Sequence, residues 1–166
     1  MTLTSSAWRD GGEIPPPYTQ AGEDMSPPLQ WTGAPEGVVS YALVVHDVDA
    51  AAGNGTEDLL HWLVWNIPAA VTSFHEHSPS MSQLPDGTRQ ISASGPQYRG
   101  PGAAATGPLH HYTFEVYALD AKIDVAASTA AQPVTAALET RAAVMKAMQG
   151  HVLGKAVYVG LFRRPQ

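Results

Sequence analysis

The sequence contains no cysteine, and this absence removes several kinds of chemistry. Its 166 residues can form no disulfide, offer no thiolate to a metal ion and hold no cysteine nucleophile. The absence does not identify a compartment, because a cytosolic protein does not need disulfides. A chain of this length can bury roughly 70% of its unfolded surface and needs no such cross-links. We expect one domain over residues 1–166.

Positive charge is also scarce. Lysine and arginine total 9 against 15 aspartates and glutamates, which gives a net charge of -6. The only basic pair is Arg163-Arg164, at the end of the chain. Proteins that bind nucleic acid usually carry a basic face, and proteins that bind anionic membranes usually carry a polybasic cluster. We therefore predict no nucleic-acid partner and no binding to a membrane surface.

Long apolar runs are missing as well, although apolar residues make up 44% of the chain. No run approaches the ~20 residues that span a bilayer. Residues 1–8 lack the charged and apolar regions of a signal peptide. We therefore expect a folded cytoplasmic protein without a membrane span.

Two buried strands are predicted in the first half of the chain. Residues 41–47 and 60–67 are nearly continuous apolar runs, as is typical of strands that are covered on both faces. The turn signal Gly53-Asn54-Gly55 lies between them, and Pro68 ends the second run. Simple alternation places the side chain of His61 on the same face as Leu63 and Trp65.

The second half contains a long loop, two more strands and a helix. Residues 72–109 are expected to be mostly loop. Residues 110–119 alternate, and residues 155–162 form a closing strand. Pro133 and Gly150 frame a helix of roughly 133–149. Its expected core-facing stripe comprises Val134, Leu138, Met145 and Met148. This pattern predicts a mostly β, antiparallel sandwich with a peripheral C-terminal helix.

Four polar side chains fall within or at the ends of the predicted strands. Asp47 ends the first strand and His61 begins the second, while His110 and Tyr112 share a face of a third. If the strand ends converge, they form a cavity with a carboxylate, two imidazoles and a phenol. Such a set could donate hydrogen bonds to an anion, or could act as a general acid and base. Any single histidine is more often structural than functional.

Six segments of the chain resemble the phosphatidylethanolamine-binding protein family, which includes the Raf kinase inhibitor proteins and their small bacterial relatives. The segments resemble the family patterns S-P-P-L-x-W, D-P-D-A, W-H-W, G-P-x-P-P, G-x-H-R-Y and H-I-L-G-K-A. They are Ser26–Trp31, His46–Ala50, Leu60–Trp62, Tyr98–Pro101, Gly107–Tyr112 and His151–Ala156.

The resemblance implies an antiparallel β-sandwich whose pocket, at one edge, accepts phosphate, acetate or a phospho head group without a metal or a cofactor. The residues carried over to the pocket are Asp47, His61, His110 and Tyr112. Gly100 and Pro101 would form part of the rim, where backbone amides help to hold an anion.

Two departures from the family pattern concern the rim of this pocket. Val48 stands where the pattern has proline, and Gly102 is followed by three alanines instead of a Pro-Pro pair and a polar residue. Because proline lowers loop entropy, we expect a looser or wider rim. The alanines suggest a larger and less polar ligand.

Two functions remain open. The first is a binding module for a small anionic or phospho-containing ligand; the resemblance implies modulation of a kinase or protease partner, and a homodimer. The alternative is an acid–base enzyme acting on a small biosynthetic molecule. In that enzyme Asp47 and His61 together would act as the general base, and His110 or Tyr112 would supply the general acid.

Two further residue sets could be interpreted as metal sites, but the sequence supports them less well than the two functions above. Two histidines and an aspartate match the residue types of the 2-His-1-carboxylate iron triad, but their spacing does not require a metal. His75-Glu76-His77 is interpreted as a solvated surface cluster in a loop. We therefore expect no metal site.

Overall fold

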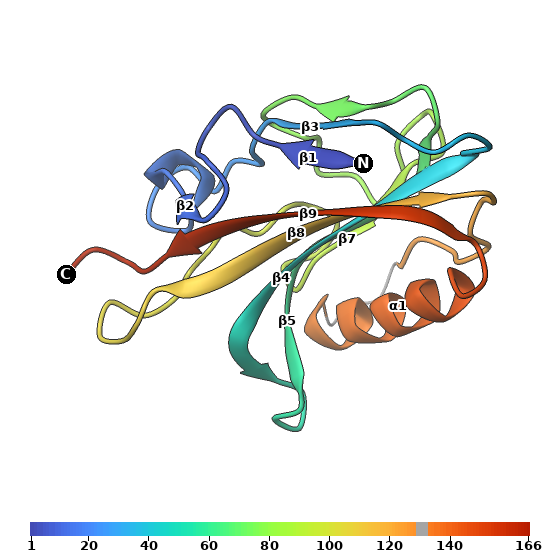
Figure 1. The fold of residues 1–166 in the computed structure, drawn as a ribbon. Coiled ribbons are helices and arrows are strands. Elements are labelled where there is room, and N and C mark those ends of the chain that lie inside the picture. Colours follow the sequence, from blue (N-terminus) through green and yellow to red (C-terminus); the bar gives the residue numbers. More distant parts are fainter. Residues whose placement is uncertain (129–132) are drawn as a thin grey trace.

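The computed structural model describes residues 1–128 and 133–166, which form two β-sheets and one α-helix (Figure 1). The larger sheet has the strand order β2-β9-β8-β4-β5-β7, and the smaller has the order β1-β3-β6. The strands are β1 (Thr2–Thr4), β2 (Gly12–Glu13), β3 (Leu29–Thr32), β4 (Ser40–Ala52), β5 (Glu57–Pro68), β6 (Ser73–Phe74), β7 (Arg89–Ile91), β8 (His110–Leu119) and β9 (Val152–Phe162). The helices are the short 3-10 helix Pro16–Tyr18 and α1 (Pro133–Ala147).

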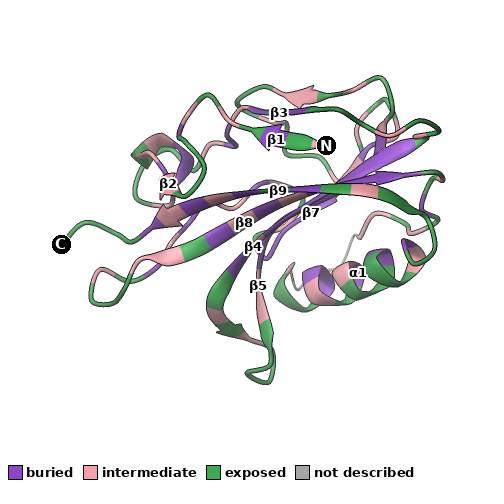
Figure 2. Ribbon diagram, viewed as in Figure 1, coloured by how far each residue is buried: buried purple, intermediate pink, exposed green. Residues whose placement is uncertain are grey.

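The fold is the predicted β-sandwich with a peripheral helix. The small sheet covers one face of the large sheet, and α1 lies against the other face (Figure 1). A core rich in aromatic side chains, including Trp31, Trp62 and Phe114, fills the space between the sheets. A second core lies under α1, and the purple segments of Figure 2 mark both layers. Among the described residues, β2 and β9 pair in parallel and the other strand pairs are antiparallel.

The two predicted buried strands are confirmed, and they pair as an antiparallel hairpin that extends beyond the predicted runs. β4 and β5 extend beyond their apolar runs to Ala52 and Glu57, which pair next to the turn. Gly53 and Gly55 have φ values of 59° and 90°, a region that side chains with a Cβ rarely adopt. The glycines therefore allow the tight reversal that brings the two buried strands side by side.

The helix is confirmed, but the predicted apolar stripe is wrong at two positions. Val134 and Met145 are 48% and 36% exposed, whereas Met148 is buried. The side chains that α1 buries are mostly small: Ala136, Ala137, Thr140 and Val144. Small side chains allow a helix to approach the sheet closely, so the buried face was set by side-chain size and not by the largest apolar residues.

No helix among residues 1–128 and 133–166 is both long enough and apolar enough to cross a membrane.

Candidate functional site

His61 reaches the candidate site through a β-bulge. Where β4 pairs with β5, Val45 is opposite Trp62 and the next residue, His46, is opposite Leu60. His61 of β5 therefore has no partner residue on β4. The extra residue turns the side chain out of simple alternation. The prediction that His61 shares a face with Leu63 and Trp65 is therefore wrong: those two lie in the core under α1, while the His61 ring contacts Tyr112 on the other face.

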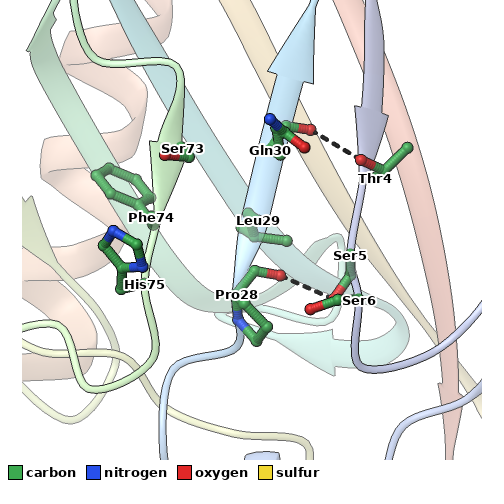
Figure 3. A pocket seen from close by; sticks show the side chains of 9 residues that line it. All are labelled: Thr4, Ser5, Ser6, Pro28, Leu29, Gln30, Ser73, Phe74 and His75. Carbon is green, nitrogen blue, oxygen red and sulfur yellow. Dashed lines mark hydrogen bonds between the residues drawn. The ribbon is translucent and has the colours of Figure 1, made fainter.

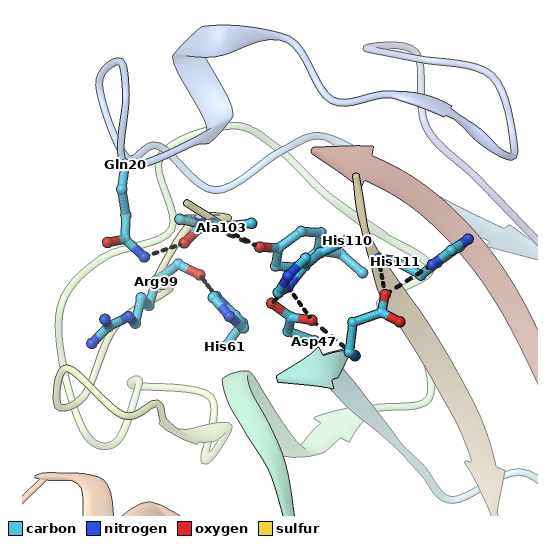
Figure 4. A network of polar contacts seen from close by, with 11 residues as sticks. Gln20, Asp47, His61, Arg99, Ala103, His110 and His111 are labelled. Carbon is cyan, nitrogen blue, oxygen red and sulfur yellow. Dashed lines mark hydrogen bonds and ion pairs between the residues drawn. The ribbon is translucent and has the colours of Figure 1, made fainter. Parts of the chain in front are cut away.

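The four predicted side chains line one cavity of about 320 Å³. Asp47 on β4 is opposite Tyr112 on β8, and this register brings His110 beside them. Figure 4 shows Asp47, His61 and His110 around this space, with Arg99 and Gln20 on the far side of His61. The full lining comprises Gln20, Asp47, Ala50, Leu59, His61, Arg99, Gly102, Ala103, His110, Tyr112 and Arg164.

Asp47 is paired with His110. The His110 Nδ1 lies 2.8 Å from Oδ2 and 3.1 Å from Oδ1 of Asp47, and the backbone N–H of Asp49 donates to Oδ1 at 3.0 Å. Because the carboxylate accepts, Nδ1 of His110 carries the proton, and Nε2 is the free ring nitrogen when the ring is neutral. We expected Asp47 to pair with His61 as a general base. In the structure, Asp47 pairs with His110 instead.

His61 has a different partner. Its Nδ1 lies 2.7 Å from the carbonyl oxygen of Arg99, which can only accept, so Nδ1 donates. Its Nε2 is buried and has no hydrogen-bond partner among the described residues. Burial lowers the pKa of His61 below its ordinary value, although the Arg99 carbonyl and the Asp47 charge act in the opposite direction. Near neutral pH the ring is thus uncharged, and Nε2 holds a lone pair.

Tyr112 is a fully buried member of the cavity wall. Its hydroxyl oxygen accepts hydrogen bonds from the backbone N–H groups of Gly102 and Ala103 at 3.3 and 3.2 Å. Burial raises the pKa of this phenol well above its usual value, and the nearby Asp47 charge adds to the effect. Tyr112 is therefore a neutral phenol at any physiological pH.

The rim is arranged differently from the expectation. Gly100 and Pro101 are not in the cavity wall. The N–H of Gly100 donates to Asp24, and its carbonyl accepts from the side chain of Gln20 at 2.7 Å. A Cβ at Gly100 would lie 2.6 Å from an Asp24 oxygen, so this close approach requires glycine.

The alanine segment is anchored at Ala103. This residue is buried, its N–H donates to Tyr112, and its carbonyl accepts from the backbone N–H of Arg164 at 3.1 Å. Val48 is 47% exposed and does not line the cavity. The two departures from the family pattern thus leave this part of the rim held in place by hydrogen bonds.

Sequence reasoning missed three polar residues of the wall: Gln20, Arg99 and Arg164. Arg99 stands inside one of the family-like segments, and Arg164 belongs to the only basic pair of the chain. These two signals were present, but only the fold brings the C-terminal segment to the pocket. The three side chains make the wall more polar than the alanines suggest, which disfavours the expectation of a less polar ligand.

Residues 1–128 and 133–166 contain no group of three or more His, Asp or Glu side chains arranged to hold a metal ion. Within the His75-Glu76-His77 segment, the carboxylate of Glu76 accepts a hydrogen bond from the hydroxyl of Tyr18 at 2.5 Å. Glu76 is thus tied to the fold.

A larger hollow of about 420 Å³ lies over the small sheet, beside Gln30 and Phe74 (Figure 3). Hydroxyl groups line much of it, but two of them already have partners. Thr4 donates to the carbonyl of Gln30 at 3.3 Å, and Ser5 donates to that of Pro28 at 2.8 Å. None of the buried unpartnered polar atoms of the described chain belongs to this hollow, which sets it apart from the His61 cavity.

Fold and cavity together define a class of protein: a β-sandwich with a small polar pocket at one end of its strands. More specifically, the chain belongs to the phosphatidylethanolamine-binding protein family, which matches residues 4–163. It is 39% identical to a UPF0098 protein of Methanothermobacter thermautotrophicus, with 99% of each chain covered. A UPF0098 protein of Pyrococcus horikoshii is 33% identical over 96% of this chain and 75% of its own length.

Solved structures agree with this assignment. A phosphatidylethanolamine-binding protein homolog from Chlamydia trachomatis superposes with a TM-score of 0.77 at 27% identity, covering 98% of this chain and 97% of its own. YbcL of E. coli, described as a member of the mammalian family, gives a TM-score of 0.75 at 25% identity, with 98% of both chains covered. The resemblance to the bacterial branch is thereby confirmed.

Proposed function

We propose that this protein binds a small oxyanion or phospho-containing ligand in the cavity lined by Asp47, His61, His110 and Tyr112. One observation carries the proposal: the Nε2 atom of His61 is buried at the cavity and has no hydrogen-bond partner within the described chain. A buried polar atom without a partner is costly, and a ligand that supplies the partner removes the cost.

The charges of the wall favour an anion. Arg99 and Arg164 are both cationic and outnumber the single carboxylate of Asp47, whose oxygens already accept from His110 and from a backbone amide. The Nε of Arg99 is also buried without a hydrogen-bond partner among residues that are described. Arginine suits phosphate and carboxylate because its planar fork offers several donors.

The first experiment is a titration of inorganic phosphate into the protein at pH 6, followed calorimetrically, with two alanine variants. His110→Ala removes the imidazole that pairs with Asp47 and leaves this carboxylate to repel the anion, so binding should weaken at least tenfold. His111→Ala is the matched control, because the adjacent ring instead pairs with Asp49 at 2.8 Å. Equal affinities in all three proteins, or no binding, would exclude this pocket as the anion site.

One observation favours acid–base catalysis as a second candidate. Asp47 fixes the tautomer of His110, the arrangement that orients a general base. An enzyme of this kind should show a bell-shaped pH profile that is lost in His110→Ala and kept in His111→Ala. Ligand binding without turnover across a panel of small phosphorylated and carbonyl compounds would argue against catalysis and leave binding as the only proposed function.

A further inference from the structure

The unpaired nitrogen of His61 restricts which anions the cavity can take. Because Nδ1 donates to the Arg99 carbonyl, Nε2 of the neutral ring is a hydrogen-bond acceptor. The ring is only 1% exposed, so it cannot turn toward solvent for a donor. A fully deprotonated oxyanion would place an oxygen lone pair against the lone pair of Nε2, which is repulsive.

We propose that the cavity takes its oxyanion together with one proton, which lies between Nε2 of His61 and an oxygen of the ligand. This inference rests on the proposed function and specifies its ligand class. Phosphomonoesters fit, because their second pKa is about 6 and they exchange a proton near neutral pH. Sulfate esters, which have the same tetrahedral shape but carry no proton, fit poorly.

Groups from several elements around His61 bear on where this proton resides. Asp47 on β4 favours a protonated ring, as do the carbonyls of Arg99 and Gly100 after β7. The Arg99 charge opposes protonation. The other titratable or charged groups of the wall are His110 and Tyr112 on β8 and Arg164 after β9. The ring centre of Tyr112 is 5.1 Å from that of His61.

The balance of these charges sets the expected coupling. In the free protein, burial keeps the His61 ring neutral. An arriving phosphate ester stabilises a proton between Nε2 and its own basic oxygen; the monoanion brings this proton, and the dianion takes it from solvent. The weakly basic oxygens of a sulfate ester leave the proton to the buried ring, which burial disfavours. Above about pH 7 the ligand is mostly dianionic. Binding then draws one proton from solution, and the affinity should fall about tenfold for each further pH unit.

Calorimetry can count this proton. Methyl phosphate is titrated into the wild-type protein at pH 8 in two buffers with different ionisation enthalpies, and again at pH 5. We expect an uptake near one proton at pH 8 and near zero at pH 5, where the ligand already carries it. The uptake at pH 8 should fall to near zero in His61→Gln, because an amide can donate an N–H at any pH. His151→Gln, an exposed site paired with Asp120, should retain it.

Methyl sulfate separates the proton from the charge. At pH 5 both methyl esters are mainly monoanions, but only the phosphate has an O–H to donate to Nε2. We expect methyl sulfate to bind at least tenfold more weakly. This comparison uses the wild-type protein alone, so it decides the matter even where His61→Gln does not fold.

The failures can be told apart. Binding of methyl phosphate with no proton uptake at pH 8, or with equal affinity for methyl sulfate, would overturn this inference and leave the anion pocket standing. Full uptake in a folded His61→Gln would assign the proton to His110 and would also overturn it. Absence of binding by inorganic phosphate and both esters would overturn the proposed function and this inference together.

Discussion

His46 and Asp47 are neighbours on β4, but they serve opposite faces of the larger sheet. Asp47 faces the cavity with His110 and His61, while His46 lies on the α1 side between two carboxylates. Its Nδ1 is 2.5 Å from Asp58, and its Nε2 is 3.7 Å from Glu115, within ion-pair distance but beyond a hydrogen bond. Both sites combine imidazole with carboxylate, so residue types alone do not distinguish them.

The difference lies in whether the charges are matched. On the His46 side, Arg141 of α1 also pairs with Asp58, and Lys155 of β9 lies 2.9 Å from Glu115. Burial disfavours a charged His46 ring, but the hydrogen bond with Asp58 and the nearby Glu115 carboxylate outweigh burial and raise its pKa to about 9. The Nε2 of His46 is also buried without a hydrogen-bond partner among the described residues, but it lies within ion-pair distance of Glu115 in a network of matched charges. The Nε2 of His61 belongs instead to a residue of the cavity wall, where a ligand could supply its partner. We infer that the face with His46 stabilises the fold and that the face with Asp47 and His61 binds the ligand.

The largest expected effect comes from breaking the network at its centre. Asp58→Ala removes a partner of both His46 and Arg141 and should lower the free energy of unfolding by about 3 kcal/mol, measured in urea at pH 7. Asp120→Ala, which breaks an exposed pair with His151, should cost about 0.5 kcal/mol or less. Phosphate affinity should stay within about twofold of wild type in both variants. A loss of phosphate binding in Asp58→Ala would erase the distinction between the two faces.

A slightly smaller effect concerns alkaline pH. The folded pKa of His46, about 9, exceeds its ordinary value of 6.5, so its contribution is complete below pH 6.5 and is lost as the pH rises through 9. A shift of this size corresponds to at most about 3.4 kcal/mol, and screening by solvent reduces it. We therefore expect wild type to lose about 2 kcal/mol of stability over this range through His46, and His46→Gln to lack that loss. His151→Gln should behave as wild type. The same slope in His46→Gln would show that another group titrates there.

At acid pH the same ion pairs are weakened because their carboxyl groups, those of Asp58 and Glu115, become protonated. Burial favours the neutral acids, but contacts with His46 and with other donors hold the pKa values of Asp58 and Glu115 at about 2. Their contribution is present above the ordinary carboxyl pKa of about 4 and is lost as the pH falls toward 2. Because the three groups share the same contacts, these losses do not add to that of His46.

His61 should give the opposite slope, with a smaller size. Burial lowers its folded pKa, so below pH 6.5 the unfolded chain binds a proton that the folded chain does not. Wild-type stability should therefore rise with pH up to about 6.5, and this part of the rise should disappear in His61→Gln. Urea unfolding at pH 5 and pH 7 measures it. An unchanged difference between the two pH values would mean that the His61 ring is already protonated in the folded protein.

Much of the cavity could be predicted from the sequence, because alternation is a local property. It placed Tyr112 on the inner face of β8, and the polar end of an apolar run located Asp47. The same rule failed at His61, where the bulge depends on how β5 pairs with β4. Arg164 could not be placed either, since its position depends on contacts with Ala103 across more than sixty residues of chain. Long-range pairing, and not residue type, determined what was missed.

The same reasoning explains the helix. Periodicity correctly located α1, but the choice of buried face depends on the space that β5 and β7 leave, and this favoured Ala136 and Ala137 over Val134. Hydrophobicity ranks side chains by their transfer from water, whereas close packing also selects them by volume. A one-dimensional pattern contains the first quantity and lacks the second.

The smallest predicted effect tests whether every buried unpaired atom marks a binding site. Thr113 is opposite His46 on the network face, and its Oγ1 is buried with no hydrogen-bond partner in the described ranges. Unlike His61, it is not part of the wall of the Asp47–His110 cavity, so we interpret it as a packing defect. Thr113→Val keeps the shape and should be neutral or raise the free energy of unfolding by about 0.5 kcal/mol.

The same substitution at Thr19 provides the matched control. Its buried hydroxyl donates to the Pro16 carbonyl at 2.9 Å and accepts from the N–H of Ala21 at 3.2 Å, so Thr19→Val should cost about 1–2 kcal/mol. Opposite signs at the two threonines, both measured in urea, would support the view that an unpaired atom matters for binding only where its residue borders a cavity. A clear loss of stability in Thr113→Val would instead show that its hydroxyl is satisfied in solution, and the contrast with His61 would then rest on the cavity alone.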